Sequence, residues 1–434
     1  MKIKKTVLII FGLIISLTIQ AQNNYQGQLG YGLSPNGHPY DYSQFGAFLD
    51  EVANTCVNGG VAFANGAWRD SYSTSGKIPN VHKTVSLLQP TPYDYTDMIN
   101  FGWRSGSLLH LNVPGNNTNN WTNDLAKSLF LNMLIHAADS LTPTYMFIGN
   151  ETSRYWELDS VDYLNWVSFY HKAYDSIKSH SPSTKVGTVF NYEHLSGKGE
   201  LTGFTTPYWQ AFDAHDTSKI DILGLTVYPF FHDSTANDIP VTYLDPIFTR
   251  LGNKALAITE TGWPSDSFIG TWSCSPAQQV DYVNKLFNII DGKNVEVVNW
   301  LFLHYSKDTT DTDADKIFRS VSLRDSLGID QPALSVWLSK CNQSSSSKIG
   351  FKNNASTSFS IFPNPVKDIL TISSKEKFNN CIIKMYGIRG ELLIENRVDT
   401  YNKHHINMTN YANGIYFIEV CQDKSVSRYQ FIKN

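Results

Sequence analysis

Short apolar runs alternate with longer amphipathic stretches from about residue 24 to residue 341. Several of the runs are apolar at successive positions, which is typical of strands buried on both faces of a parallel sheet. Counted from a run at 28–32, the predicted strands cover 61–63, 108–113, 145–148, 186–190, 220–227, 255–258 and 295–302. Strands that alternate with helical patterns over this length predict an α/β fold, and their number favours a closed (β/α)8 TIM barrel over an open doubly wound sheet.

The pattern changes after this long domain. A polar, serine-rich segment follows, and beyond it short alternating strands are predicted over 369–372, 382–386, 414–420 and 429–432, separated by Gly and Asn turns. Such a segment is typical of a small all-β sandwich. We therefore expect the barrel over 23–341, a linker over 342–356 and a second domain over 357–434.

The first 22 residues are set apart by their composition. Lysines at positions 2, 4 and 5 precede an apolar run over 7–19 and a short polar, small-residue end. This order is that of a secretory signal peptide, and the run is too short to span a membrane. No later segment is long enough to span one, so we expect an exported protein without a transmembrane anchor.

Composition excludes several classes of partner. The net charge is −4 and 17% of the residues are charged, so the chain has no basic footprint for nucleic acid. No glycine-rich phosphate loop follows a predicted strand, and we expect no cofactor. Asp311, Asp313 and Asp315 lack the glycine and the glutamate of a calcium loop, so we predict no metal site there.

The five cysteines show no metal-binding spacing and are too few to build a scaffold. Buried thiols are the default interpretation. In a closed barrel the first and last helices are neighbours, so Cys56 and Cys341 are one candidate disulfide pair. Cys381 and Cys421 are a second candidate pair, within the C-terminal segment.

Two glutamates each follow an apolar run at the point where a strand should end. Glu151 ends the fourth predicted strand and Glu260 ends the seventh. A buried carboxylate without partners costs several kcal/mol, so the fold alone does not account for either residue. The carboxyl ends of barrel strands converge on one face, where a pair of glutamates can hydrolyse a glycosidic bond.

The local sequences support this interpretation. Gly149, Asn150 and Glu151, together with the run 259–265 around Glu260, resemble the acid/base and nucleophile motifs of the large clan of retaining β-glycosidases built on this barrel. The second motif is most similar to those of endo-β-1,3-glucanases and endo-β-1,4-galactanases. The resemblance implies that Glu151 is the general acid/base, that Asn150 binds the sugar 2-hydroxyl, and that Glu260 is the nucleophile.

Other residues near strand ends are candidates for supporting roles. The resemblance implies that the Tyr228 hydroxyl donates to Glu260, and the charge of Arg69 would act in the same direction. Trp300 is a candidate floor on which a sugar ring stacks, and Trp263 a candidate subsite residue. Barrel packing and structural ion pairs are the alternatives for these side chains. Substrate contact or ordinary polar packing is open for four more residues, His110, Asn112, Asn191 and His304.

The C-terminal segment carries a second resemblance. The run 362–365 (Phe-Pro-Asn-Pro), the run 385–390, the run 413–416 and the closing 431–433 resemble, in order and spacing, the C-terminal sorting domain of bacterial type IX secretion substrates. This resemblance implies export across an outer membrane, with the secretion machinery as partner, and a secreted or surface-attached protein.

Together these features predict a secreted retaining β-glycosidase, endo-acting on a β-linked polysaccharide or oligosaccharide. Two alternatives remain open. One is a carbohydrate-binding or surface-adhesion protein on a barrel without catalysis, and the other is an inverting hydrolase. The separation of the two carboxyl groups distinguishes them, at about 5 to 5.5 Å for retention and about 6.5 to 9.5 Å for inversion.

Overall fold

The computed structural model describes two folded parts of the chain. The described residues are 25–37, 42–56, 60–67, 96–102, 104–105, 108–109, 111–199, 203, 205–266, 274–306, 313–341, 359–374, 377–378, 380–387, 391–399, 402–422 and 425–434. The expected signal peptide and linker lie outside these ranges.

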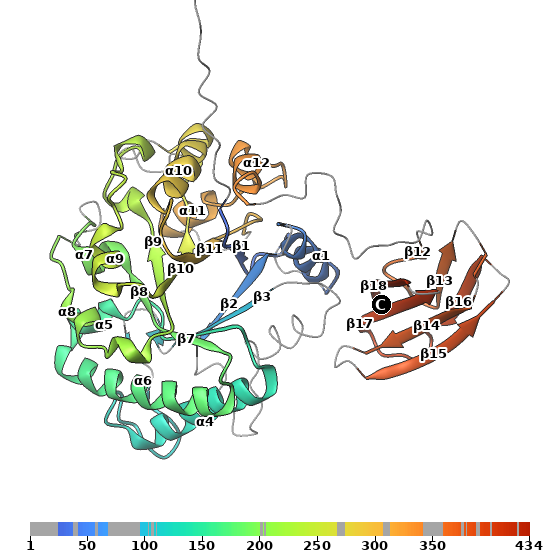
Figure 1. Ribbon diagram of the computed structural model, residues 1–434, viewed down its shortest axis with the longest axis horizontal. Helices are drawn as coiled ribbons and strands as arrows, with labels where there is room; N and C mark the ends of the chain where they lie inside the picture. The colour runs from blue at the N-terminus through green and yellow to red at the C-terminus, as the bar shows by residue number, and fades with distance from the viewer. Residues whose placement is uncertain are drawn as a thin grey trace, which may run out of the picture.

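The first part is a closed barrel of parallel strands (Figure 1). Its strands are β1 (Gln28–Gly32), β2 (Val61–Ala67), β3 (Thr96–Gly102), β6 (Tyr145–Ile148), β7 (Lys185–Gly187), β8 (Val189–Asn191), β9 (Ile222–Val227), β10 (Ala255–Thr261) and β11 (Val295–Trp300). The sheet runs in the order β7-β6-β3-β2-β1-β11-β10-β9-β8. Only Thr188 separates β7 from β8, so these are two halves of the fifth strand and the sheet closes on itself. The predicted (β/α)8 barrel is confirmed.

The third strand is not where the sequence predicted it. It is β3, which pairs with β2 and β6, whereas the predicted run at 108–113 contributes only β5 (Leu108–Leu109), antiparallel to β4 (Arg104–Ser105). The sequence of β3, TDMINFG, mixes polar with apolar residues and lacks the continuous apolar run of its neighbours. The strand count is unchanged, so Glu151 still follows the fourth strand.

Helices cover the outside of the barrel (Figure 1). They are α1 (Tyr42–Ala53), α4 (Asp124–Leu141), α5 (Ser153–Leu158), α6 (Ser160–His180), α7 (Tyr192–Ser196), α8 (Gln210–Asp213), α9 (Asp245–Leu251), α10 (Pro276–Ile289), α11 (Asp313–Ser320) and α12 (Pro332–Leu338), with 3-10 turns η2 (Thr217–Lys219), η3 (Pro229–Phe231) and η4 (Ala236–Asp238). The side chains of Asn123 and Asp159 cap α4 and α6. Within the described residues, no helix is both long and apolar enough to cross a membrane.

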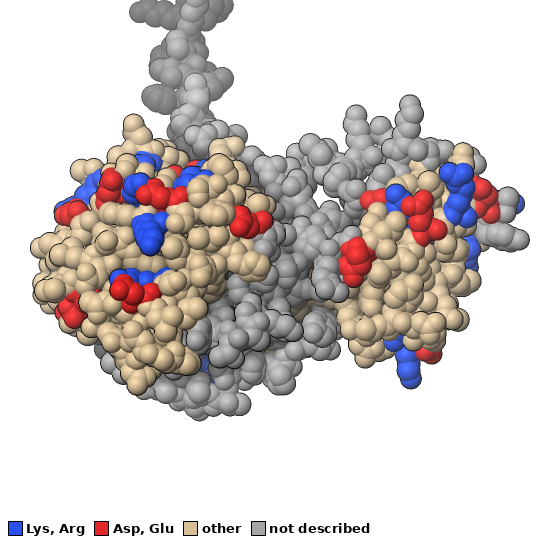
Figure 2. All heavy atoms as spheres, turned by 90° about the horizontal axis from the view of Figure 1, so that it is seen from below, with Lys and Arg blue, Asp and Glu red and all other residues tan. Residues whose placement is uncertain are grey.

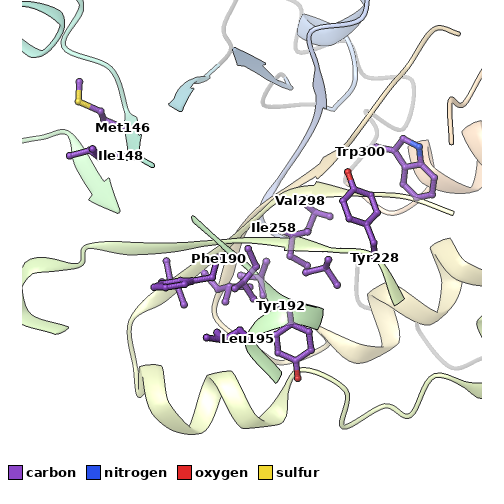
Figure 3. Packing of buried hydrophobic residues seen from close by; sticks show 14 of the residues in the cluster. Met146, Ile148, Phe190, Tyr192, Leu195, Tyr228, Ile258, Val298 and Trp300 are labelled. Carbon is purple, nitrogen blue, oxygen red and sulfur yellow. The ribbon is translucent and has the colours of Figure 1, made fainter. Parts of the chain in front are cut away.

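The strands pack on both faces, as their apolar runs require. Tyr145 and Phe147 of β6 belong to a cluster inside the barrel, while Met146 and Ile148 belong to the larger cluster under the helices. Figure 3 shows this outer cluster, with side chains from several strands packed together. At the amino-terminal end of the interior, Lys185 pairs with Glu296 at 2.7 Å. Two packed layers therefore hold the strands, and the opposite end is left for the site.

A disulfide joins the two ends of the barrel domain. Cys56, after α1, is bonded to Cys341, after α12, with 5.9 Å between the Cα atoms. The backbone N–H of Tyr25 also donates to the carbonyl of Lys340 at 2.9 Å. The first candidate pairing predicted from the sequence is therefore confirmed.

The C-terminal part is an all-β sandwich of two antiparallel sheets (Figure 1). One sheet has the order β12 (Phe359–Phe362), β13 (Ile369–Ser374), β16 (Lys403–Asn407), and the other β15 (Leu392–Val398), β14 (Cys381–Tyr386), β17 (Gly414–Gln422), β18 (Ser425–Lys433). Ile372 from the first sheet and Ile383 and Ile418 from the second share one core. The predicted sandwich is confirmed.

The second candidate disulfide is wrong, since neither Cys381 nor Cys421 is disulfide-bonded. Cys381 lies opposite Gln422 in the β14 and β17 ladder, and Cys421 lies opposite Ile382. Because side chains alternate along a strand, the two sulfurs point to opposite faces of the sheet. Neighbouring strands bring the backbones together without bringing the thiols together.

The surface carries charges of both signs. On the face shown in Figure 2, the described Lys and Arg side chains are interspersed with Asp and Glu side chains, without an extended area of one sign. The described residues on this face therefore form no basic footprint of the kind that binds nucleic acid.

Candidate active site

One cavity brings the two strand-ending glutamates together. It has a volume of about 450 Å³ and is lined by Asn150, Glu151, Arg154, Asn191, Tyr228, Phe231, Glu260, Leu301, Phe302 and Phe318. Asn191 and Glu260 lie near the ends of β8 and β10, and the other lining residues follow β6, β9 and β11 or lie on α5, η3 and α11. They come from the carboxyl ends of the strands, as the barrel topology requires.

Glu151 reaches the cavity through an unusual backbone turn. Strand β6 ends at Ile148, and Gly149 and Glu151 then adopt left-handed conformations with φ of 83° and 53°. A non-glycine residue in this region costs about 1 to 2 kcal/mol, so the surrounding structure has to hold it. The backbone N–H of Thr152, which donates to the Val189 carbonyl at 3.0 Å, ties the turn to β8. The strained turn aims the carboxyl group into the cavity.

Two side chains hold the Glu151 carboxyl group. Asn191 Nδ2 donates to Oε1 at 3.0 Å, and Thr226 Oγ1 donates to the same oxygen at 2.8 Å. The Asn191 amide cannot turn over, because its Oδ1 caps α7 by accepting the N–H of His194 at 2.9 Å. No hydrogen bond from the described residues reaches Glu151 Oε2, which is therefore the oxygen available to carry a proton.

Glu260 lines the same cavity from β10, the strand that pairs with β9. A shift in the β10 and β9 register between Ile258 and Glu260 places Glu260 opposite Thr226. Since Thr226 itself donates to Glu151, both glutamates adjoin this residue of β9, and both line the cavity. The Tyr228 hydroxyl donates to Glu260 Oε2 at 3.3 Å.

The two carboxyl groups affect each other. Burial raises the pKa of Glu260 to about 8, the charge of Glu151 adds to the increase, and hydrogen bonds from Tyr228 and Asn150 oppose it. Burial, followed by the charge of Glu260, raises the pKa of Tyr228 well above its ordinary value, so its hydroxyl stays a donor. Burial and the charge of Glu151 therefore favour the protonated form of Glu260, and the two hydrogen bonds favour its anion.

The two predicted tryptophans do not line the cavity. Trp300 is fully buried, its Nε1 donates to the Val321 carbonyl at 2.8 Å, and it packs on Trp337 with 5.4 Å between ring centroids. Figure 3 shows it within the packed cluster near Tyr228. Trp263 is fully buried as well. The structure corrects both predictions, because neither indole has an exposed face on which a sugar could stack.

Three phenylalanines line the cavity in their place, and the sequence analysis missed them. Phe231 belongs to η3, Phe302 follows β11, and Phe318 lies on α11. Phe231 and Phe302 lie in segments that directly follow strands and Phe318 lies on a helix, and the apolar pattern gives no signal that these three rings meet at the cavity. They supply the apolar surface that was expected from Trp300.

The remaining candidates differ in whether they line the cavity. Asn191 lines the cavity, whereas His304 Nε2 is paired with Glu51 at 2.8 Å outside the lining. Asn112 lies in a loop and is not among the lining residues. Arg69 and His110 lie outside the described residues.

Arg154 and Thr226 were also missed, although the sequence held a signal for each. Arg154 lies three residues after Glu151, on α5, and its Nη1 contacts Glu157 Oε2 at 3.0 Å. Thr226 precedes Tyr228 by two residues and so shares its side of the strand. Across the described ranges, no group of three His, Cys, Asp or Glu residues could hold a metal ion.

Comparisons with protein families give two matches. Residues 113–314 match the model described as Glycosyl hydrolase family 53, and residues 360–434 match the one described as Secretion system C-terminal sorting domain. A comparison with curated protein sequences gave no match. The first match spans both glutamates of the cavity, and the second coincides with the β sandwich.

Solved structures resemble the chain at low identity. An exo-β-1,4-mannosidase from Opitutaceae bacterium strain TAV5 is 12% identical with a TM-score of 0.54, covering 75% of this chain and 62% of that one. A GH5_18 enzyme from Bifidobacterium longum is 13% identical with a TM-score of 0.52, covering 72% and 77%. Two fungal β-1,4-galactanases are represented at 14% identity and a TM-score of 0.49, covering 72% and 99%.

The chain also matches longer proteins, and it spans only 46% of the length of a β-glucuronidase from Bacteroides uniformis. At these identities, the structures with TM-scores above 0.5 show the barrel fold alone. Similarity beyond the barrel fold rests on the two family models, over residues 113–314 and 360–434.

Proposed function

We propose that the protein is a secreted endo-β-1,4-galactanase that acts with retention, because residues 113–314 match the model of Glycosyl hydrolase family 53 and residues 360–434 match that of a secretion sorting domain. The observation that carries the proposal is the convergence of Glu151 and Glu260 on one cavity inside the region that matches family 53. The sorting domain makes the protein secreted or attached to the cell surface, with the secretion machinery as its proposed partner.

In the first step, a carboxylate oxygen of Glu260 attacks the anomeric carbon of the sugar. The bond from that carbon to the leaving oxygen breaks, and Glu151 gives its proton to the leaving oxygen. A glycosyl ester on Glu260 and a shortened polysaccharide with a free hydroxyl result.

In the second step, water attacks the same carbon and Glu151 accepts one of its protons. The ester bond to Glu260 breaks, which restores the carboxylate and releases the sugar with its original anomeric configuration. Protons and charges are restored at the end of the cycle.

The hydrogen bonds of the cavity suit these two roles. Glu151 is held through Oε1 alone, so Oε2 is left to exchange a proton with the leaving oxygen and then with water. The hydroxyl of Tyr228 and the amide of Asn150 stabilise Glu260 as the anion. The reaction needs Glu260 ionised, and the hydrogen bonds from Tyr228 and Asn150 favour that form.

Substrate contacts follow from the other lining residues. The rings of Phe231, Phe302 and Phe318 offer apolar surface to the C–H faces of a pyranose. Asn150 is proposed to bind the 2-hydroxyl. Arg69 is proposed to add a guanidinium beside Glu260 and to lower the pKa of that carboxyl group.

The proposal is tested with the full mature chain on β-1,4-galactan, β-1,3-glucan and β-1,4-mannan. Reducing ends are counted, and NMR identifies the anomer that forms first. We expect hydrolysis of galactan with the β anomer formed first, and a loss of roughly 10⁴-fold or more in Glu260→Gln and Glu151→Gln. Glu296→Gln, at the opposite end of the barrel, is the matched control and should keep the wild-type rate.

Three other outcomes would contradict the proposal. Initial release of the α anomer would mean an inverting hydrolase. Binding of a glycan by the wild type without cleavage would mean a carbohydrate-binding protein. Wild-type activity in Glu260→Gln would remove the proposed nucleophile.

A further inference from the structure

Arg154 is the only Lys or Arg among the described residues that line the cavity, and the two steps above do not use it. It lies on α5, three residues after Glu151, and 26% of its side chain is exposed, so a ligand in the cavity can reach it. A guanidinium has five N–H donors and no acceptor. What Arg154 can bind is therefore an oxygen atom of a ligand.

Arg154 is held by a carboxylate that two other segments hold in turn. Its Nη1 donates to Glu157 Oε2 at 3.0 Å. The Nε2 atom of His194, on α7, lies 3.0 Å from the same oxygen, and the Tyr208 hydroxyl donates to Oε1 at 3.3 Å. His194 is fully buried, and its ring stacks on that of Tyr208 with 4.7 Å between the centroids and 10° between the planes. Groups outside α5 therefore fix Glu157.

This arrangement is more than a surface ion pair needs. A solvent-exposed pair three residues apart on a helix adds little stability, because ordering two long side chains costs entropy. Here donors from α5, from α7 and from the segment before α8 order Glu157, and Glu157 orders the guanidinium that lines the cavity. A guanidinium that is already ordered loses little further freedom when it binds a ligand.

The charges around Arg154 favour a neutral ligand. Glu157 balances the guanidinium at 3.0 Å, and Glu151 and Glu260 bring two further carboxyl groups to the cavity. The described lining residues therefore carry no net positive charge that would attract an acidic sugar. Hydroxyl oxygens of a neutral sugar accept hydrogen bonds without bringing charge, so they suit this position.

One side of the cavity is apolar and adjoins Glu260. The ring centroids of Phe231 and Phe318 lie 6.2 Å apart, and those of Tyr228 and Phe318 lie 5.5 Å apart. The Tyr228 hydroxyl donates to Glu260 at 3.3 Å. The aromatic rings and the proposed nucleophile therefore belong to the same side of the cavity.

The other side is polar and adjoins Glu151. Asn191 donates to Glu151 and caps α7 by accepting the N–H of His194, so α7 supports both Glu151 and the residues that hold Arg154. Around the barrel, β6 and β8 lie on one side of β9, and β10 and β11 lie on the other. Arg154 therefore lies with Glu151, away from the strand that carries Glu260.

In a retaining reaction the nucleophile attacks one face of the anomeric carbon, and the leaving oxygen departs from the other face, where the acid/base protonates it. The sugar that departs therefore lies on the side of Glu151. We propose that Arg154 binds this departing sugar, and that its guanidinium, oriented by Glu157, donates to hydroxyl oxygens of the neutral galactosyl unit beyond the cleaved bond. The assignment rests on the proposed function, because the two carboxyl groups define the leaving side. Glu157 is a positioning residue that acts through Arg154.

Two substrates with different leaving groups test the assignment. The compound 4-nitrophenyl β-1,4-galactobioside carries an aryl group, without sugar hydroxyls, where β-1,4-galactan carries a further sugar. Arg154→Met should lower kcat/KM on galactan by roughly 10- to 100-fold, because hydrogen bonds from a charged donor are lost, and should change it by less than about 3-fold on the aryl substrate. Arg154→Lys should give an intermediate loss on galactan, since lysine keeps the charge without the planar fork of donors.

A second variant tests the orientation of the guanidinium. Glu157→Gln should lower kcat/KM on galactan by roughly 3- to 10-fold and leave the aryl substrate unaffected, a split that a merely structural role would not produce. In the Arg154→Met background it should add no further loss, because both changes act on the same contact. Lys127→Met is the matched control. It breaks an ion pair of the same helical spacing, with Asp124 at 2.7 Å on α4, and should leave kcat/KM unchanged on both substrates.

Equal losses on galactan and on the aryl substrate in Arg154→Met would overturn the inference, and so would a wild-type kcat/KM of that variant on galactan. A crystal structure of Glu260→Gln with bound galactotetraose gives a test that does not depend on the aryl substrate. We expect a guanidinium nitrogen of Arg154 within about 3.2 Å of an oxygen of the sugar on the leaving side. The absence of such a contact would overturn the inference as well. If Glu260→Gln keeps the wild-type rate on galactan, the proposed function fails instead, so the two failures are distinguishable.

Discussion

Removal of the disulfide between Cys56 and Cys341 should destabilise the barrel without changing its chemistry. The bond closes a loop with a sequence separation of 285 residues and has 5.9 Å between its Cα atoms. Chain-entropy theory gives about 6 kcal/mol for a loop of this length, and native disulfides contribute about 2 to 5 kcal/mol in practice. We therefore expect Cys56→Ala with Cys341→Ala to lose about 3 to 5 kcal/mol of unfolding free energy.

The measurement is urea unfolding of the full mature chain, followed by tryptophan fluorescence. The ten tryptophans of the chain all precede the β sandwich, so the signal reports the barrel. The midpoint should fall in the double variant, and a reductant should lower the wild-type midpoint by a similar amount without affecting the variant. Cys421→Ser is the matched control, since Cys421 forms no disulfide and is only half-buried. A loss under about 1 kcal/mol, or a wild type insensitive to reductant, would refute the reasoning.

Three further predictions concern the carboxyl groups of the site and their partners. Burial raises the pKa values of Glu193, on α7, and of Glu260 from 4.5 to about 8, so the folded state binds more protons between these values and stability should fall as pH rises from 4.5 to 8. The free energy of unfolding, measured in urea at pH 5 and at pH 8.5, should fall less between these pH values in Glu193→Gln than in the wild type, with a difference of at most about 5 kcal/mol. An equal fall in the two proteins would contradict a raised pKa of Glu193. Asn191→Leu should lower kcat on β-1,4-galactan by roughly 10-fold, because Glu151 loses one of its two hydrogen-bond donors. A rate equal to that of the wild type would show that Thr226 alone is sufficient to hold the Glu151 carboxyl group. Arg69→Met should move the acidic limb of the kcat/KM profile to higher pH, whereas an unmoved limb would remove Arg69 from the surroundings of Glu260.

Much of the architecture could be predicted because its signals are local. Continuous apolar runs of four to six residues mark strands buried on both faces, and they do so wherever the strands end up. Topology then brings strand ends together, so a glutamate after the fourth strand and one after the seventh had to meet. Glu151 and Glu260 line one cavity for this reason. The same closure of the ring made Cys56 and Cys341 neighbours.

Predictions failed where the outcome depends on which side of an element a side chain occupies. Cys381 and Cys421 lie on paired strands, yet a register offset of one residue puts their sulfurs on opposite faces. Trp300 ends a strand as expected, but its indole turns into the packing against Trp337 and away from the cavity. No residue type or spacing carries that information.

The sequence by itself determined the barrel, the sorting domain and the two converging carboxyl groups, because each depends on local composition or on the order of strands. Only the tertiary structure decided the surroundings of those groups. Glu151 is held by Asn191 and Thr226 from two other strands, and the same turn of α7 carries Glu193. Protonation depends on burial and on neighbouring charges and donors, which exist only once distant segments have packed together.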